Sequence, residues 1–512
     1  MTVETSVAAR SRSHPVLNAA AVPLAIVALA LTARLAAFDG HLWYDEIYGA
    51  VFSALGPVDM LVAILRFDLH PPLYYLQLGL WALPSGADPW LALNALAWSL
   101  AALAGLYLGA LRVFGRDVAA GAAALFALMP MAIYEADQVR MYAFLMALAV
   151  AAWYGIERLA DESGAAAWKR WAVLAGVAEL AIAYTHATGM LMIPAFPAYL
   201  ALRAWEAGPG RRGALLKRAV LLHAIIAVAS LPALGNSMVR SVSHTSAPSA
   251  SQVWSTLTQL VVGPPSWIAA ALMALVLATL LGGAVADRRV RALTLAFVVL
   301  PPALLLAISH GFRPAWHIRA LLFSEPLVAL ALAAAVVALA ERMRAAAMVV
   351  AAVLAMGFGV QAAVQVARAG KSDDFPAAAA FLDSRREAGD AVIAPDTTVF
   401  WGLARQYLGP DWGSPLRVQA SDPPERWADI RAKLGPEWWR RLGLEAEGDA
   451  AGPDGRRLLV GWGALPEATA APRIWLAQVP PLEMEPLAKL GWRAVEEHDF
   501  KGLKLSLWRP AP

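Results

Sequence analysis

Residues 43–48 read Trp-Tyr-Asp-Glu-Ile-Tyr and place two adjacent carboxylates, Asp45 and Glu46, directly after the first long apolar run of the chain, residues 16–38. A second polar segment, His-Pro-Pro-Leu-Tyr-Tyr at residues 70–75, belongs to the same loop. Most of the remaining sequence is apolar enough to lie in lipid. Ionisable groups are therefore gathered at a membrane surface, which predicts an enzyme rather than a passive anchor.

The overall composition indicates a membrane protein. Of the 512 residues, 59% are hydrophobic and 16% are charged, whereas soluble domains carry about 25% charged residues. The mean hydropathy is +0.54. The net charge of +3 is small, and the basic residues cluster in short loops, which favours membrane orientation over nucleic-acid binding. Because cysteine is absent, disulfides, thiolate metal sites and cysteine nucleophiles are excluded.

Apolar runs long enough to span a bilayer predict about eleven transmembrane helices. They cover residues 16–38, 91–111, 118–134, 141–157, 171–187, 189–204, 219–235, 267–285, 292–309, 320–340 and 345–366. The first run is longer than a signal-peptide core and is interpreted as an uncleaved span, with cleavage after Ala36-Ala37 as the alternative. Lys and Arg are concentrated in alternate loops, which predicts a cytoplasmic N-terminus and places the acid pair and the C-terminus outside.

The composition changes after the last apolar run. Tryptophans recur there among charged, Pro-rich and Gly-rich sequence. A helix is predicted at residues 377–386, and strands at residues 391–394, 458–461, 474–479 and 503–508. We therefore expect a transmembrane domain, residues 1–366, and a small soluble α/β domain, residues 367–512, on the outer face.

The adjacent carboxylates are expected to differ in role, since neighbouring residues cannot share one face of a helix. A partly desolvated Asp45 could act as general base toward a hydroxyl, with Glu46 orienting it or binding substrate. The structural alternative is a solvated loop that caps a helix beginning near Ile47.

Two further segments outside the apolar runs carry candidate side chains. Two prolines after His70 would stiffen the backbone and hold His70 and Asp68 in place, or simply mark the start of an aromatic helix. Arg140 begins a helix, where a guanidinium and a helix N-terminus both attract anions such as phosphate. The alternative is an arginine paired with Asp137 or Glu135.

The remaining ionisable candidates lie near or within predicted spans. His186 occupies a short outer turn and Arg319 precedes the tenth span. Each is either a ligand for an anion or a cation at the membrane interface. Glu179 and Glu325 fall inside predicted spans, where carboxylates are costly and often functional. Glu325 could instead pair with Arg319.

Taken together, these segments resemble the integral-membrane GT-C glycosyltransferases. The branch they resemble is the bacterial one related to protein O-mannosyltransferases and to lipid A aminoarabinose and galacturonic acid transferases. The matching motifs are Trp43-Tyr44-Asp45-Glu46, residues 70–75, Arg140-Met141-Tyr142, Tyr184-Thr185-His186 and Arg319, in this order over residues 15–340. The resemblance implies a membrane all-α bundle in a bacterial cytoplasmic (inner) membrane.

The resemblance also implies a reaction. A sugar would move from a polyprenyl phosphate to an acceptor hydroxyl of a glycolipid, lipopolysaccharide or protein, with inversion and without a nucleotide. Asp45 matches the catalytic aspartate, with Glu46 beside it. The leaving phosphate would be stabilised by Arg140 together with Arg319, His70 or His186. The side chains then expected to bind substrate are Asp68, Tyr74, Asp137, Gln138 and Tyr142.

Three positions depart from the family pattern. Gln138 stands where the family usually has Glu, so that the neighbouring Asp137 takes over the acidic role or the role is lost. Residues 91–99 lack the arginine that the family tends to have near the start of the second span, and Ala320 replaces a tyrosine. The sugar and the acceptor therefore stay open.

Two other classes of function are compatible with the composition. A transporter or flippase of lipid-linked sugars should show inverted repeats and helices broken near the midplane. The sequence shows no such symmetry, and its ionisable cluster lies at the outer surface. A non-catalytic scaffold would present the tryptophan-rich outer domain. No cofactor signature is present, and no His/Asp spacing demands a metal, although carboxylates are available for a divalent cation.

Overall fold

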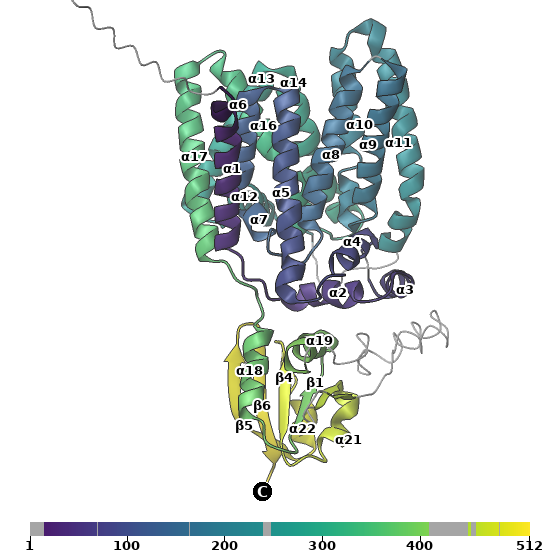
Figure 1. Ribbon diagram of the computed structural model, residues 1–512, viewed down its shortest axis with the longest axis vertical. Coiled ribbons are helices and arrows are strands. Elements are labelled where there is room, and N and C mark those ends of the chain that lie inside the picture. The colour runs from purple at the N-terminus through teal and green to yellow at the C-terminus, as the bar shows by residue number, and fades with distance from the viewer. Residues whose placement is uncertain are drawn as a thin grey trace, which may run out of the picture.

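The computed structural model describes residues 15–68, 70–162, 164–238, 247–408, 449–451, 457–480 and 482–512. Figure 1 shows a helical bundle followed, after helix α17 (Arg344–Ala367), by a smaller unit built around a sheet. In the described ranges, seven helical segments are long and apolar enough to cross a membrane, which makes the chain a multi-pass membrane protein. They are Asp88–Val113, Tyr142–Asp161, Pro209–Gly235, Trp267–Ala286, Arg288–Gly311, Leu322–Ala340 and Arg344–Ala367.

The other four predicted spans correspond to shorter or more polar helices. Residues 16–38 form α1 (Pro15–Ala36), of which Ala20–Ala36 is a shorter apolar helix. The other three runs correspond to α6 (Arg116–Leu128) with α7 (Pro130–Tyr134), α9 (Ala165–Ala183) and α10 (Ala195–Glu206). The number of about eleven spans therefore stays a prediction.

The bundle contains these membrane-length helices and several shorter ones. The longer ones are α5 (Asp88–Val113), α8 (Tyr142–Asp161), α11 (Pro209–Met238), α12 (Ala250–Val262), α13 (Trp267–Ala286), α14 (Arg288–Leu293), α15 (Leu300–Gly311), α16 (Glu325–Ala340) and α17 (Arg344–Ala367). Short helical turns join them: η1 (Ala187–Leu191), η2 (Thr294–Val299), η3 (Ile318–Ala320) and η4 (Leu322–Ser324).

Pro130 splits the predicted run 118–134 in two. It is the first residue of α7, and Met129 before it is extended, with φ −63° and ψ 123°. Proline disfavours helical backbone in the residue that precedes it, so α6 stops inside the bundle. The short helix α7 then carries the chain into the loop that contains Arg140.

Helix α16 lies at the centre of the bundle. In the most apolar stretch of its membrane-length segment, 78% of the residues are buried, compared with 28% in the corresponding stretches of α17 and α11. Small residues allow the neighbouring helices to approach it closely. A Cβ atom at Gly283 of α13 would lie 2.3 Å from the Cβ atom of Ala335 and 2.6 Å from its Cα atom. The backbones of α13 and α16 therefore meet at this glycine.

We expect Gly283→Ala to lower the free energy of unfolding by about 1–3 kcal/mol, because the added methyl group overpacks a backbone contact. Gly359→Ala is the matched control, since a Cβ atom there meets nothing within 4 Å and alanine has the higher helix propensity. Thermal unfolding of both variants in detergent measures the difference. Equal melting temperatures would show that α13 and α16 are not in close contact.

Three surface helices close one end of the bundle. They are α2 (Tyr44–Ser53), α3 (Pro57–Phe67) and α4 (Leu73–Trp81), and Figure 1 shows them at the end that faces the sheet. All three lie in the first polar loop of the chain. The motifs that the sequence analysis placed at a membrane surface therefore occupy the boundary between the bundle and the smaller unit.

The smaller unit contains a six-stranded sheet with the order β2-β3-β1-β4-β6-β5. The four predicted strands are confirmed as β1 (Ala391–Ala394), β3 (Arg457–Val460), β4 (Ile474–Gln478) and β6 (Leu503–Pro510), and the predicted helix as α18 (Phe375–Arg385). The additional strands are β2 (Asp449–Ala451) and β5 (Trp492–Phe500), and the short helices are α19 (Thr397–Leu403), η5 (Ala404–Leu408), η7 (Trp462–Ala464), α21 (Leu465–Ala468) and α22 (Glu485–Lys489).

Strand direction agrees with a mixed α/β unit. Strand β1 pairs in parallel with both β3 and β4, whereas the β2–β3, β4–β6 and β5–β6 pairs are antiparallel. Every residue of β1 and β4 is buried, as expected for central strands covered on both faces. Residues 409–448 and 452–456 of the predicted soluble domain lie outside the described residues.

Helix α19 attaches the smaller unit to α2. The Tyr44 hydroxyl donates to Asp396 Oδ2 at 3.1 Å, and Thr398 Oγ1 donates to the Tyr48 hydroxyl at 3.0 Å. Tyr44 precedes Asp45 directly. The sheet unit is therefore bonded to the helix that presents the acid pair.

Candidate active site

The two adjacent carboxylates of α2 have different surroundings. Glu46 is fully buried, and its carboxylate accepts the backbone N–H of Val139 at 2.5 Å and that of Trp43 at 3.1 Å. The side chain of Asp45 is 29% exposed and forms an ion pair with Arg319. The two acids thus differ in burial and in partners, while the expected difference in role stays a prediction. Glu46 holds backbone in place, whereas Asp45 is accessible.

Lys371 is a member of this cluster that the sequence analysis did not identify. It lies between α17 and α18, and its ammonium group is fully buried. The Nζ atom lies 2.8 Å from Glu46 Oε1 and 3.2 Å from Asp137 Oδ2, and it donates to the Asp137 carbonyl at 2.5 Å. Burial raises the pKa of Glu46 to about 7, and the positive charge of Lys371 opposes that rise.

Asp137 joins this network to the end of the first span. Its two carboxylate oxygens accept the backbone N–H groups of Asp39 and Gly40, each at 3.2 Å. Gly40 has a φ of 79°, a left-handed conformation that glycine adopts without strain. Burial raises the pKa of Asp137, and Lys371 opposes this shift. Glu46, Asp137 and Lys371 thus connect three distant loops.

Two guanidinium groups converge on Asp45 from other segments. Arg319, in η3, pairs with its carboxylate and lies 5.2 Å over the ring of Trp43. Arg140 donates from Nη1 to the Asp45 carbonyl at 2.9 Å, and its Nη2 lies 3.5 Å from His70 Nε2. Desolvation opposes the charge of both arginines, but Tyr75, Tyr142 and Asp45 raise the pKa of Arg140 overall. Tyr142, Asp45 and Glu135 likewise raise the pKa of Arg319. Both arginines therefore stay charged.

A pair of stacked imidazoles completes the cluster. The His70 and His186 rings lie 4.4 Å apart with an interplanar angle of 29°. Desolvation and the neighbouring Arg140 and Arg319 lower the pKa of His70 well below its ordinary value. Desolvation, followed by His70 and Arg140, has the same effect on the pKa of His186. Both rings are consequently neutral at pH 7.

Local turns fix the orientation of both histidines. The Asp68 carboxylate accepts the His70 backbone N–H at 2.9 Å and the Tyr75 hydroxyl through its second oxygen. Thr188 donates its backbone N–H to His186 Nδ1 at 3.1 Å. Nδ1 of His186 is therefore the acceptor, which leaves the ring proton on Nε2.

The cluster contains donors that lack acceptors. His70 Nδ1 and Arg140 Nε are buried, and no hydrogen-bond partner is present for either atom. A buried donor without an acceptor is costly, so such atoms call for an explanation. An anion between Arg140, Arg319 and His70 would supply acceptors and balance the positive charge. Phosphate, with several acceptor oxygens, meets both needs.

The other predicted residues lie around this cluster. Gln138 Oε1 accepts the indole N–H of Trp43 at 2.7 Å, and the Tyr142 ring lies 5.5 Å from His186. Tyr74 is buried against Tyr75, with ring centroids 5.6 Å apart. Within residues 91–99, which lack an arginine, the Asn94 amide oxygen accepts a hydrogen bond from the Gln77 amide at 3.0 Å.

The two acids predicted inside spans, Glu179 and Glu325, do not belong to the cluster around Asp45. Arg319 pairs with Asp45, so the alternative of an Arg319–Glu325 ion pair is not observed. Glu325 is fully buried, and its oxygens have no hydrogen-bond partner. Glu179 lies 3.4 Å from His223 Nε2. In the described ranges, no group of three or more His, Asp or Glu side chains is placed to hold a metal ion.

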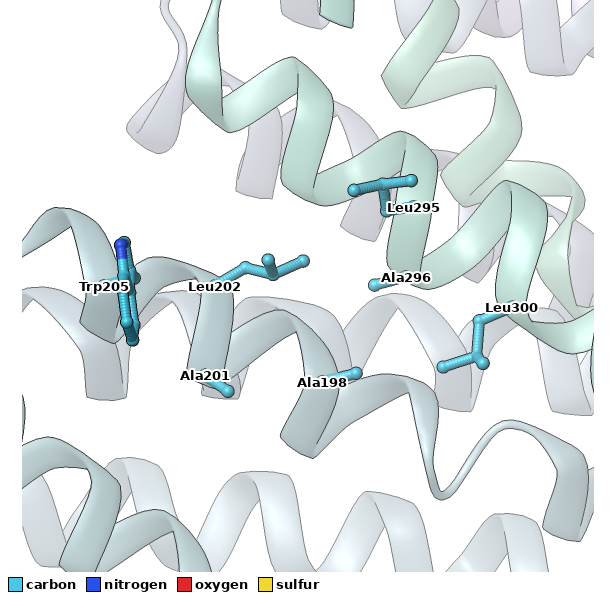
Figure 2. Close-up of a pocket in the computed structure, with 7 residues that line it drawn as sticks. All are labelled: Ala198, Ala201, Leu202, Trp205, Leu295, Ala296 and Leu300. Atoms are coloured by element: carbon cyan, nitrogen blue, oxygen red, sulfur yellow. The ribbon is translucent and has the colours of Figure 1, made fainter.

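A separate apolar cavity lies between α10 and the η2–α15 segment. Its volume is about 420 Å³, and Figure 2 shows its lining. The lining residues are Ala198, Ala201, Leu202, Trp205, Leu295, Ala296 and Leu300. No ionisable side chain lines this cavity, so it offers nothing for acid–base chemistry.

Comparisons with known proteins identify the fold. No family model matches the chain, and no curated protein matches its sequence. In three dimensions it is similar to crystal structures of ArnT from Cupriavidus metallidurans in the apo state, with a TM-score of 0.64, and bound to undecaprenyl phosphate, with a TM-score of 0.59. Each match has 14% identity and covers 96% of this chain and 98% of that chain. The chain thus has the GT-C fold that its motifs predicted.

Proposed function

We propose that this protein is a glycosyltransferase of a bacterial cytoplasmic membrane. It transfers a sugar from a polyprenyl phosphate to an acceptor hydroxyl on the outer face, with inversion at the anomeric carbon. The observation that carries the proposal is the accessible Asp45 carboxylate beside two arginines and two neutral histidines at one end of a membrane bundle. A base and an anion site adjoin there, as sugar transfer from a phosphate requires.

The ion pair between Arg319 and Asp45 suggests the order of events. In the resting protein, Arg319 neutralises the carboxylate. When the donor phosphate arrives, Arg319 and Arg140 bind its oxygens, and Asp45 is released to accept a proton. His70 and His186 donate further hydrogen bonds. Because both rings are neutral, they add no charge that would compete with the arginines.

In the transfer step, the anomeric carbon exchanges its bond to phosphate oxygen for a bond to the acceptor oxygen. The acceptor oxygen forms a bond to the anomeric carbon, and its proton passes to Asp45. The bond between that carbon and the phosphate oxygen breaks, and its electron pair leaves with the polyprenyl phosphate. The arginines stabilise the added charge. Attack from the face opposite the phosphate inverts the anomeric configuration.

The structural similarity to ArnT supports a polyprenyl phosphate as the carrier of the donated sugar. ArnT, which shares this fold, has been crystallised with undecaprenyl phosphate. Substrate binding is assigned to Asp68, Tyr74, Gln138 and Tyr142, which lie around the cluster. Glu46 and Asp137 are assigned to hold the loops that carry Asp45 and Arg140. The acceptor is a glycolipid, a lipopolysaccharide or a protein.

The proposed topology follows from charge. The basic loops and the N-terminus are cytoplasmic, so that the transmembrane domain, residues 1–366, presents Asp45 on the outer face. The soluble α/β domain, residues 367–512, then also lies outside. This placement agrees with a lipid-linked donor, since nucleotide sugars are made in the cytoplasm.

Purified protein in proteoliposomes with a defined polyprenyl-phosphate sugar tests the proposal. The expected result is stoichiometric release of polyprenyl phosphate and appearance of the sugar on an added acceptor fraction. Parallel reactions with a chelator and with added divalent cations measure whether a metal is needed. Movement of intact donor across the bilayer without any release would instead identify a transporter of lipid-linked sugars.

Arg140→Ala should lower kcat/KM for the donor at least about tenfold, because removing a charge-assisted bond to phosphate costs about 1.4 kcal/mol or more. The loss should be in the donor KM or in kcat, and the acceptor KM should be unchanged. Arg493→Ala, which removes an exposed arginine of β5, serves as the control. A change confined to the acceptor KM would argue against phosphate binding at Arg140.

A further inference from the structure

A basic pocket lies at the opposite end of the bundle from the candidate active site. It has a volume of about 620 Å³ and is lined by Arg112, Tyr154, Arg158, Arg170 and Trp171. Arg112 and Arg158 are in the last turns of α5 and α8, and Trp171 is near the start of α9. Helix α8 begins at Tyr142, beside His186, so about 16 residues and roughly 24 Å of helix separate the two sites.

Close helix contacts fix the walls of the basic pocket. A Cβ atom at Gly109 would lie 2.9 Å from the Trp153 ring, and one at Gly155 would lie 2.9 Å from the Ala175 backbone nitrogen. Helix α8 is therefore held closely against both α5 and α9. The Tyr154 and Trp171 rings meet edge to face at 5.5 Å. The aromatic side of the pocket is thus built into the helix packing.

The basic pocket carries uncompensated positive charge. The guanidinium groups of Arg158 and Arg170 lie 5.4 Å and 4.5 Å over the Trp171 ring. The nearest acids in the sequence of α8 are already paired. Glu157 and Asp161 both bind Arg203 and lie within 3.9 Å of Arg289. Among the residues that the structure describes, none forms an ion pair with the three pocket arginines.

Two donors in the basic pocket lack acceptors. Arg158 Nε and Trp171 Nε1 are buried, and neither has a hydrogen-bond partner. Leaving such donors unpaired costs free energy. A ligand that fits must therefore be an acceptor and an anion. Phosphate oxygens match both requirements, and arginine binds them with good geometry.

The surface beside the pocket is apolar. Leu108, which lies one turn from Arg112 on the same face of α5, is 49% exposed, and Val173 and Val177, on the Arg170 face of α9, are 64% and 61% exposed. Helix α5 is long and apolar enough to cross the membrane, and α9 corresponds to a predicted span, so such side chains are expected to contact acyl chains. A phosphate in the pocket would thus be continuous with a hydrocarbon surface.

We propose that the basic pocket binds the phosphodiester headgroup of an anionic phospholipid, with its acyl chains against α5 and α9. Basic pockets between transmembrane helices on the cytoplasmic side are suited to such headgroups. The pocket lies away from Asp45, and the inference does not depend on the proposed glycosyltransferase activity. The bound lipid would link α5, α8 and α9 at the end of the bundle where their charges repel.

Native mass spectrometry of the delipidated full chain, titrated with phosphatidylglycerol or phosphatidylcholine, tests this site. The wild type should retain phosphatidylglycerol with at least about tenfold preference. Arg158→Gln combined with Arg170→Gln should weaken that binding about thirtyfold. Arg344→Gln, which removes an exposed arginine at the start of α17, should leave it unchanged.

A second variant and a competition experiment with inorganic phosphate distinguish the possible outcomes. Trp171→Phe keeps an aromatic ring, although a smaller one, and removes the unpaired N–H, so it should weaken binding several-fold even if the double variant does not fold. Equal retention by the wild type and both pocket variants would overturn the proposal. Displacement of the lipid by millimolar inorganic phosphate would assign the pocket to a free anion and overturn the lipid assignment.

Discussion

Asp45→Asn is expected to lower kcat for sugar transfer at least about 10²-fold, the usual contribution of a positioned general base. The amide keeps the size of the carboxylate but cannot take the acceptor proton. The fold should survive, because Arg140 bonds to the carbonyl of residue 45 and not to its side chain, and the side chain is 29% exposed. Initial rates in proteoliposomes at saturating donor measure kcat directly.

The effect of this variant on the donor KM is equally informative. Arg319 would lose its anionic partner and be available to the donor phosphate, so the donor KM should stay constant or fall. Asp117→Asn, an exposed acid in the first turn of α6, controls for loss of one negative charge. If Asp45→Asn retained full kcat, the proposed base would have to be abandoned.

Lys371→Met is expected to lower the free energy of unfolding by about 3–5 kcal/mol, because it leaves two buried carboxylates without their counter-charge. Transfer activity should fall with it, since Glu46 fixes both α2 and the Val139 backbone next to Arg140. Lys371→Arg should retain part of both properties. Unfolding in detergent and transfer in proteoliposomes give the two measurements.

The pH dependence of this variant has a defined sign. Burial already raises the pKa of Glu46 to about 7 while Lys371 opposes the shift, so loss of Lys371 must raise that pKa further. Between the unfolded pKa near 4.3 and the native one, the folded state binds the extra proton. The stability of Lys371→Met should therefore fall as the pH rises from about 4.3 to above 7.

A double variant identifies the source of that dependence. Glu46→Gln added to Lys371→Met removes the unpaired charge, and we expect it to recover part of the stability at high pH and to flatten the pH profile. If the two single variants were instead additive, Lys371 and Glu46 would not interact.

Much of the candidate site could be predicted because each side chain carries a local signal. Asp45, His70, Arg140 and Arg319 stand outside apolar runs, where a charged or polar residue is conspicuous, and the structure brings them together from four segments. Helix geometry alone predicted that Asp45 and Glu46 would not share one face, which agrees with their different burial. The central strands were also predictable, since β1 and β4 are short apolar runs.

Lys371 could not be predicted in the same way. It lies in an ordinary polar linker, and its partner Glu46 is 325 residues away, so no local pattern points to the pair. Strand β5, Trp492–Phe500, was missed because its sequence lacks the alternation of apolar and polar residues that marks a half-buried strand: residues 496–499 are four polar residues in a row, at the edge of the sheet. Such a strand is stabilised by its neighbour β6 rather than by burial of both faces.

The Glu46–Lys371 pair also has a consequence for biosynthesis. The chain is made from its N-terminus, so α2 reaches the membrane surface well before the segment after α17 exists. Until then, the Glu46 carboxylate has no lysine to balance it and would have to stay hydrated or protonated. The loop bearing Asp45 can therefore reach its final form only when α17 has been inserted, so that a nascent or truncated chain is inactive.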